Sequence, residues 1–92
     1  MEWSKQKVLV TGGASFIGSH LVDVLVLRGA SVRVVDDLSS GNIANIKAHL
    51  DRRHIEFIKG DLKDCSVARK SLKRIDIVFH LAADHGGRGY VD

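Results

Sequence analysis

The feature that most constrains the fold is a glycine-rich turn that directly follows a short apolar segment. Residues 7–11 (Lys-Val-Leu-Val-Thr) are mostly apolar, which is typical of a parallel strand buried on both faces. The turn occupies residues 12–18, and apolar residues then recur at helical spacing from Ile17 to Leu25. The sequence therefore predicts a strand, a tight turn and a helix in direct succession.

This turn has the properties of an anion-binding site. A helix that begins at a turn leaves backbone N–H groups without partners at its N-terminus. These donors and the positive end of the helix dipole favour a bound anion such as pyrophosphate. Gly12 would permit the sharp turn, and Gly18 would let the helix lie close to the strand.

An acidic residue follows the turn at the distance expected in a dinucleotide site. A second apolar strand, residues 31–35, ends at Asp36, which comes 18 positions after Gly18. An acid at roughly this offset, about 20 residues, accepts the ribose hydroxyls of NAD. Asp36 and Asp37 would repel the 2′-phosphate of NADP, and Arg33 lies back within the strand. The sequence therefore predicts that the chain binds NAD. The alternative is that the glycine-rich turn is a loop of an unrelated α/β protein that binds no cofactor.

Several segments together resemble one protein family. Residues 10–21 are similar to the opening of the extended short-chain dehydrogenases/reductases, which include the NAD-dependent nucleotide-sugar epimerases and dehydratases. The similarity continues through residues 36–42, 60–62 and 80–83, so it covers nearly the whole chain. The resemblance implies an α/β fold with a Rossmann-type parallel sheet.

The turn departs from the family pattern at one position. The family usually has three glycines in this turn, and Ser15 replaces the middle one. A left-handed backbone would cost serine roughly 1–2 kcal/mol. We therefore expect Ser15 to keep ordinary backbone angles and to offer its hydroxyl to a phosphate or to the helix start.

The resemblance also implies a set of cofactor contacts. The residue matching Asp61 contacts the adenine amino group, and the residue matching Leu62 packs beside the ring. Other members lie near the adenosine, the pyrophosphate or the nicotinamide ribose. The complete expected set is Gly12, Ser15, Phe16, Ile17, Gly18, Asp36, Asp37, Ser39, Ser40, Asp61, Leu62, Leu81, Ala82 and Ala83.

The last residues indicate a subfamily and a substrate contact. Residues 82–90 resemble the corresponding stretch of GDP-mannose 3,5-epimerases more than that of UDP-galactose 4-epimerases. The resemblance implies that Gly86 and Gly87 line the pocket for the sugar of a nucleotide-diphosphate sugar. The alternative is a flexible glycine loop at the end of a strand.

No catalytic residue can be assigned. The resemblance implies catalysis by a tyrosine and a lysine four positions apart, with NAD transiently oxidising a sugar hydroxyl. No Tyr-x-x-x-Lys occurs, and Tyr90 is the sole tyrosine. We therefore interpret residues 1–92 as the N-terminal part of an NAD-binding domain from an epimerase or dehydratase, without the substrate domain. The alternatives are a non-catalytic NAD-binding module and an NAD-dependent reductase.

The expected architecture has four strands and three helices. Together with the strands at 7–11 and 31–35, the sequence predicts strands at 55–59 and 75–81, in the parallel order 3-2-1-4. Helices are predicted at 16–28, 42–51 and 64–73. The fourth strand would leave an exposed sheet edge, which we expect to be an association surface.

Composition argues against several other classes of protein. The net charge is +3, but the densest basic run, residues 69–74, closes a predicted helix, and aromatic residues are too few to interleave with it. We therefore expect no nucleic-acid partner. The longest apolar stretch is too short to span a bilayer. The single Cys65 fits a reducing cytoplasm.

No metal site is expected. His49 and His54 are five positions apart, a spacing that does not place both on one face of a helix, and the sequence suggests no further ligands.

The family resemblance implies a homodimer.

Overall fold

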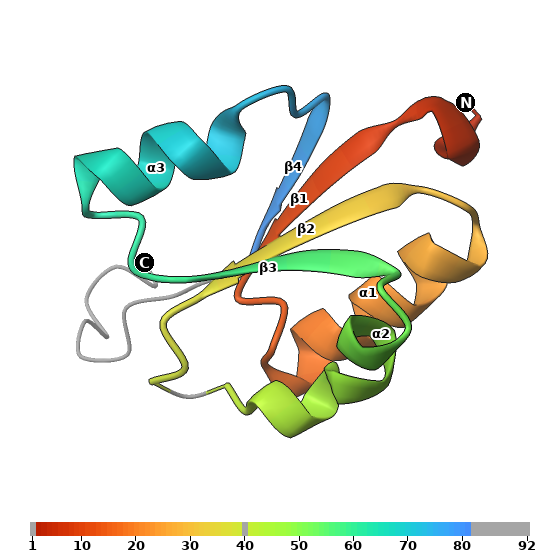
Figure 1. The fold of residues 1–92 in the computed structure, drawn as a ribbon, viewed down its shortest axis with the longest axis horizontal. Helices are drawn as coiled ribbons and strands as arrows, with labels where there is room; N and C mark the ends of the chain where they lie inside the picture. Colours follow the sequence, from red (N-terminus) through yellow and green to blue (C-terminus); the bar gives the residue numbers. More distant parts are fainter. Residues whose placement is uncertain (1, 40, 82–92) are drawn as a thin grey trace, which may run out of the picture.

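The fold was analysed in a computed structural model that describes residues 2–39 and 41–81. Its elements form an alternating β/α chain (Figure 1). In order they are η1 (Trp3–Lys5), β1 (Lys7–Thr11), α1 (Phe16–Leu27), β2 (Ser31–Asp36), η2 (Ile43–Asn45), α2 (Lys47–Asp51), β3 (Ile55–Lys59), α3 (Cys65–Leu72) and β4 (Ile77–His80).

The strands form one parallel sheet in the order β3-β2-β1-β4, which confirms the predicted topology. Figure 1 shows α1 and α2 on one face of the sheet and α3 on the other. This arrangement follows from the strand order, because the connections up to β3 run one way along the sheet and the connection to β4 runs back. Connections of one hand that run in opposite directions place their helices on opposite faces.

The core lies mainly between the sheet and α1. Alternate residues of β1 and β2 contribute to it, since successive side chains of a strand point to opposite faces. Val8, Val10 and Val34 are fully buried in this core and pack with Val22 of α1. Ile46, between η2 and α2, is also buried there, so the segment after β2 is held against the same core.

Several predicted elements differ from the structure in their bounds, and two of them by a single residue: α1 ends at Leu27, with Arg28 as its C-cap, and β2 includes Asp36. The predicted helix at 42–51 is wrong as a single helix: it is divided into η2 and α2 at Ile46, whose φ is −122° and ψ is 8°. The burial of Ile46 accounts for the division, because it directs this side chain into the core. The predicted third helix is shorter, because Asp64 is its N-cap and Lys73 its C-cap. In the structure the fourth strand begins later than predicted, at Ile77, and ends one residue earlier, at His80.

The outer strand β4 carries exposed apolar surface. Val78 is 45% exposed, and Leu72 at the end of α3 is 51% exposed. The expectation that this edge associates with another surface stays a prediction. Among the described residues, no helix is long and apolar enough to cross a membrane.

Candidate functional site

The glycine-rich turn joins β1 to α1 and has the geometry expected of it. Gly12 has a φ of +73°, in the left-handed region that favours glycine, and its N–H donates to the carbonyl of Val35 over 2.8 Å. A Cβ added to Gly18 would lie 2.2 Å from the carbonyl oxygen of Gly12 and 2.9 Å from the Cα of Gly13. Both glycines are therefore required by the backbone, and the close approach at Gly18 is to the turn itself.

Ser15 is the N-cap of α1 and keeps ordinary backbone angles, with φ −71° and ψ 166°. Its Oγ accepts a hydrogen bond from the N–H of Gly18 over 3.0 Å and donates to the carbonyl of Gly12 over 2.8 Å. The expected role of the serine hydroxyl at the helix start is confirmed. The serine at the middle position of the three-glycine pattern thus links Gly12 and Gly18, the glycines at the other two positions.

The turn keeps N–H donors available for a ligand. Within the described part of the chain, the N–H groups of Gly13, Phe16 and Ile17 have no hydrogen-bond partner. The latter two belong to the first turn of α1, at the positive end of its dipole. Phe16 and Ile17 are each 72% exposed, so this end of the helix is open to solvent.

Asp36 ends β2 beside this turn and is only 8% exposed. Its Oδ2 accepts a hydrogen bond from the N–H of Ala14 over 3.0 Å, and its Oδ1 accepts one from the N–H of Leu38 over 2.8 Å. Each carboxylate oxygen has a second lone pair, so the group can accept further hydrogen bonds from ligand hydroxyls. The structure therefore brings the predicted phosphate turn and the predicted ribose acid into direct contact.

The segment at residues 41–45, which follows β2, also contacts the turn. The carbonyl oxygen of Ala14 accepts hydrogen bonds from the N–H of Asn42 over 3.0 Å and from Nδ2 of Asn45 over 2.7 Å. A Cβ added to Gly41 would lie 2.7 Å from Oδ2 of Asp36, so this segment passes close to the acid. Sequence reasoning did not find the contacts of Gly41, Asn42 and Asn45. Gly41-Asn42 marks a turn, but the partner of that turn is not visible in the sequence.

Leu38 was also missed. It has a φ of +65°, in the left-handed region that non-glycine residues rarely adopt, two positions after the acid. Its side chain packs against the core, which holds it in this conformation. Its N–H is one of the two donors to Asp36.

The predicted adenine contacts follow β3 at the same edge of the sheet. The N–H of Gly60 donates to the carbonyl of Asp36 over 3.1 Å, which places the residues after β3 beside the acid. Asp61 is exposed, and its Oδ1 accepts a hydrogen bond from the N–H of Lys63 over 2.9 Å. Leu62 is half-buried. The carboxyl ends of parallel strands are where such folds bind ligands.

The remaining predicted residues are divided between this edge and the undescribed part of the chain. Asp37 and Ser39 are exposed and are joined by a 2.9 Å hydrogen bond from the N–H of Ser39 to Oδ1 of Asp37. Leu81 is next to the end of β1, because its N–H donates to the carbonyl of Thr11 over 3.0 Å. The other predicted contacts lie outside the described residues: Ser40, Ala82, Ala83, Gly86 and Gly87.

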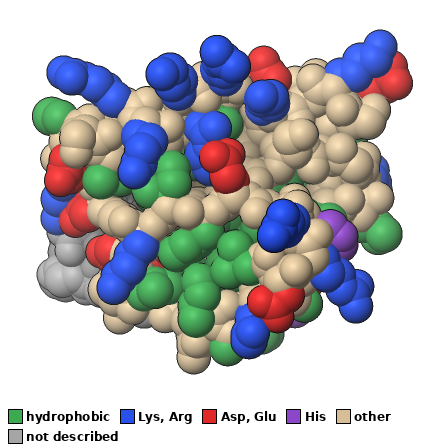
Figure 2. All heavy atoms as spheres, viewed as in Figure 1, with side chains coloured by type: hydrophobic (Ala, Val, Ile, Leu, Met, Phe, Trp, Pro, Cys, Tyr) green, Lys and Arg blue, Asp and Glu red, His purple; other side chains and the backbone are tan. Residues whose placement is uncertain are grey.

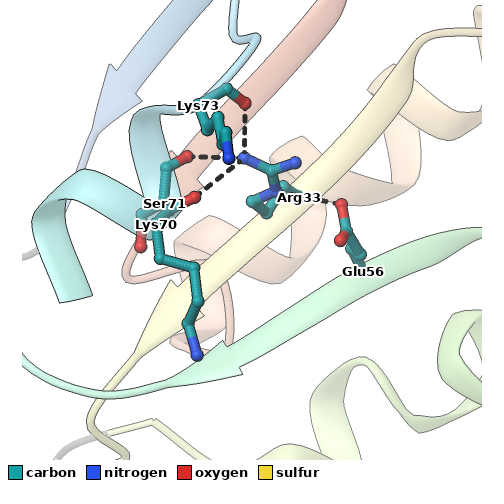
Figure 3. Close-up of polar contacts among 5 residues, drawn as sticks. All are labelled: Arg33, Glu56, Lys70, Ser71 and Lys73. Carbon is teal, nitrogen blue, oxygen red and sulfur yellow. Dashed lines mark hydrogen bonds and ion pairs between the residues drawn. The ribbon is translucent and has the colours of Figure 1, made fainter. Parts of the chain in front are cut away.

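The side chain of Arg33 lies on the face of the sheet that α3 covers, opposite to the face covered by α1, and it binds the end of α3 (Figure 3). Its Nη1 donates to the carbonyls of Lys70, Ser71 and Lys73 over 3.3, 2.9 and 2.8 Å. Its Nε donates to Oε1 of Glu56 over 2.9 Å. Figure 2 shows further lysine and arginine side chains gathered over the α3 side of the molecule. Arg33 is the arginine nearest to Asp36 in the sequence, but its guanidinium binds the last carbonyls of α3 and does not face the acid.

The two histidines of α2 and its following turn do meet. Nδ1 of His49 is 3.3 Å from Nδ1 of His54, and Nε2 of His49 is 2.6 Å from Oδ1 of Asp23. His54 lies outside α2, and the turn after the helix brings the two rings together. Helical spacing alone therefore did not predict this contact. In the described part of the chain, no group of three or more His, Cys, Asp or Glu residues is arranged to hold a metal ion.

Comparison with known proteins relates the whole arrangement to one family. A family model described as the NAD dependent epimerase/dehydratase family matches residues 8–90. UDP-glucuronic acid decarboxylase 4 of Arabidopsis thaliana is 42% identical over 76 residues, which are 83% of this chain and 16% of that protein.

Solved structures show the same relationship. An epimerase from Methanothermobacter thermautotrophicus matches with a TM-score of 0.81 and 44% identity, over 89% of this chain and 24% of that one. The dTDP-glucose 4,6-dehydratase of Bacillus anthracis, solved in complex with NAD, matches with a TM-score of 0.79 and 30% identity, over 87% and 27%. The chain thus spans between 16% and 27% of the length of these proteins.

Proposed function

Since the chain belongs to the NAD-dependent epimerase/dehydratase family, we propose that its glycine-rich turn and Asp36 bind NAD. The observation that carries this proposal is the contact between the two: the N–H of Ala14, within the turn, donates to the carboxylate of Asp36. A diphosphate on the unpartnered N–H groups would therefore have its adenosine ribose beside the carboxylate. Bound NAD would supply a hydride acceptor, and the residues of this chain would hold its adenosine and pyrophosphate.

The same site is expected to discriminate against NADP. Asp36 is 8% exposed, and its carboxylate would meet the 2′-phosphate of NADP as a like charge. Arg33 cannot compensate, because its guanidinium is bound to the end of α3 on the other face of the sheet. These two features support NAD over NADP.

The chain would hold the adenosine half of NAD better than the nicotinamide half. Asp61 and Leu62 are proposed to contact the adenine, and Asp37, Ser39 and Ser40 to lie near the adenosine. Leu81, Ala82 and Ala83 are proposed to pass near the pyrophosphate and the nicotinamide ribose. In a Rossmann-type sheet, nicotinamide and substrate lie beyond the point where the strand order reverses, toward strands after β4.

We propose that a longer polypeptide containing this chain acts on a nucleotide-diphosphate sugar. Its relatives include a decarboxylase, an epimerase and a dehydratase. A transient oxidation of a sugar hydroxyl by NAD would be common to such reactions, with Gly86 and Gly87 near the sugar. Residues 1–92 would be the N-terminal part of the NAD-binding domain. A non-catalytic NAD-binding module and a reductase remain the alternatives.

Binding measurements on the 92-residue chain test the cofactor proposal directly. Isothermal titration with NAD, AMP and NADP should give binding of NAD and AMP, with NADP at least about tenfold weaker because of the like charge. The Asp36→Asn variant removes the charge but keeps the shape of the side chain, so it should narrow the difference between NAD and NADP. Equal binding of NAD and NADP by the unaltered chain, or no binding of either, would refute the proposal.

A further inference from the structure

The carbonyl group of Ala14 is held by the segment that follows β2. Ala14 is fully buried, and its oxygen receives two donors, the N–H of Asn42 at 3.0 Å and Nδ2 of Asn45 at 2.7 Å. The N–H of the same residue donates to Asp36. The N–H of Ala14 is therefore fixed by the last residue of β2, and its carbonyl by two residues that follow β2.

This carbonyl needs to be fixed because it stands among the donors for an anion. The unpartnered N–H groups belong to Gly13, immediately before Ala14, and to Phe16 and Ile17, shortly after it. The peptide plane that contains the Ala14 oxygen also contains the N–H of Ser15. A rotation of this plane would carry a partially negative oxygen toward the phosphate and would break the 3.1 Å bond from Ser15 N–H to the Gly12 carbonyl.

Asn45 is well placed to prevent that rotation. Its own N–H donates to the carbonyl of Asn42 over 2.9 Å, and the next residue, Ile46, is 1% exposed within the core. The side-chain amide therefore starts from a backbone that is already ordered. A neutral amide also satisfies the carbonyl without placing a charge beside the anion site.

We infer that Asn45 is a positioning residue for the pyrophosphate group of the dinucleotide: its side-chain amide holds the Ala14 carbonyl toward the segment after β2 and keeps the turn in its anion-binding form. This inference rests on the proposed function. It assigns to Asn45 an effect on ligands that carry phosphate, and none on the adenosine part.

The test compares ligands with and without a diphosphate on matched variants. NAD and ADP are titrated by calorimetry, and adenosine by NMR, against the unaltered chain, Asn45→Ala, Asn45→Asp and Asn42→Ala. Asn45→Ala should weaken the binding of NAD and ADP on the order of tenfold, as expected for loss of one partly buried hydrogen bond, and should leave the binding of adenosine within about twofold. Asn45→Asp should weaken NAD and ADP further, because it replaces the donor by a charged acceptor. Asn42→Ala keeps the backbone donor to Ala14 and removes only the cap of η2, where Oδ1 accepts from the N–H of Ala44 over 2.9 Å, so it should change little.

The outcomes separate this inference from the function on which it rests. If the unaltered chain binds neither NAD nor ADP, the proposed function fails. If it binds both, but the Asn45 variants bind them as well as the unaltered chain does, the inference alone is overturned. An equal loss for adenosine and ADP would also overturn it, since that pattern is expected of general destabilisation. Thermal unfolding of each variant shows whether it is folded. If Asn45→Ala does not fold, Asn45→Asp is compared with the unaltered chain in its place.

Discussion

Substitutions at Ser15 test whether this position needs a side chain that caps α1 or the backbone freedom of the glycine that the family usually has there. Ser15→Ala removes the bond from Gly18 N–H at 3.0 Å and the bond to the Gly12 carbonyl at 2.8 Å. Loss of a serine N-cap costs about 1 kcal/mol, and loss of a neutral hydrogen bond about 1 kcal/mol. We therefore expect the free energy of unfolding to fall by about 2 kcal/mol.

Ser15→Gly should be less harmful than Ser15→Ala. Glycine is tolerated at the N-cap position, where it costs only a few tenths of a kcal/mol relative to serine. The bond to the Gly12 carbonyl is still lost, which gives an expected decrease of about 1–1.5 kcal/mol. Glycine offers no relief of strain here, because the φ of Ser15 is −71° and any residue can adopt it.

Urea unfolding followed by circular dichroism measures both changes, and thermal unfolding gives a second estimate. For a domain of this size, 1 kcal/mol corresponds to a shift in Tm of about 4–8 °C. Ser31→Ala is a suitable control, because Ser31 is exposed at the start of β2 and should change stability by less than about 0.5 kcal/mol. The reasoning is refuted if Ser15→Ala is as mild as the control, or if Ser15→Gly is more stable than the unaltered chain.

Three other changes test separate parts of the structure. Gly18→Ala should destabilise the chain by about 3 kcal/mol or more in urea unfolding, because the new Cβ would lie 2.2 Å from a backbone oxygen of the turn; a loss below about 1 kcal/mol would show that the turn can yield. Arg33→Met should cost about 2 kcal/mol by removing a charged donor from the carbonyls at the end of α3, whereas Arg69→Met in the same helix should change less than about 0.5 kcal/mol. The hydrogen bonds from the side chain of Ser66 and from backbone N–H groups lower the pKa of the Asp64 carboxyl below 3.8. The carboxylate therefore supports the start of α3 above about pH 4 and loses this effect as the pH falls through its lowered pKa; NMR of the Ser66 amide should follow that loss, and Asp64→Asn should abolish the titration.

The sequence was sufficient for the features that depend on local pattern. The order of strand, turn, helix and acid predicted the turn, the parallel sheet and the position of Asp36 at its carboxyl edge. Even the effect of Ser15 could be inferred, because helix capping involves residues a few positions apart.

The contacts that were missed join residues far apart in the sequence. Asn45 reaches the carbonyl of Ala14 across 31 positions, and Asp23 reaches His49 across 26. Neither pair produces a periodic pattern, and each depends on how the segment after β2 packs against α1. The division of the predicted helix at Ile46 has the same origin, since tertiary burial of one side chain overrides local helical preference.

The bonds that Arg33 makes to the end of α3 have a consequence for how the molecule opens. The last turn of a short helix normally frays, since its final carbonyls have no partners within the helix. Here those carbonyls are bound to a side chain from β2, an inner strand of the sheet. Freeing the end of α3 requires the guanidinium to be released from between the helix and Glu56 of β3. The last turn of α3 should therefore exchange its amide protons together with the sheet, as part of one cooperative unit.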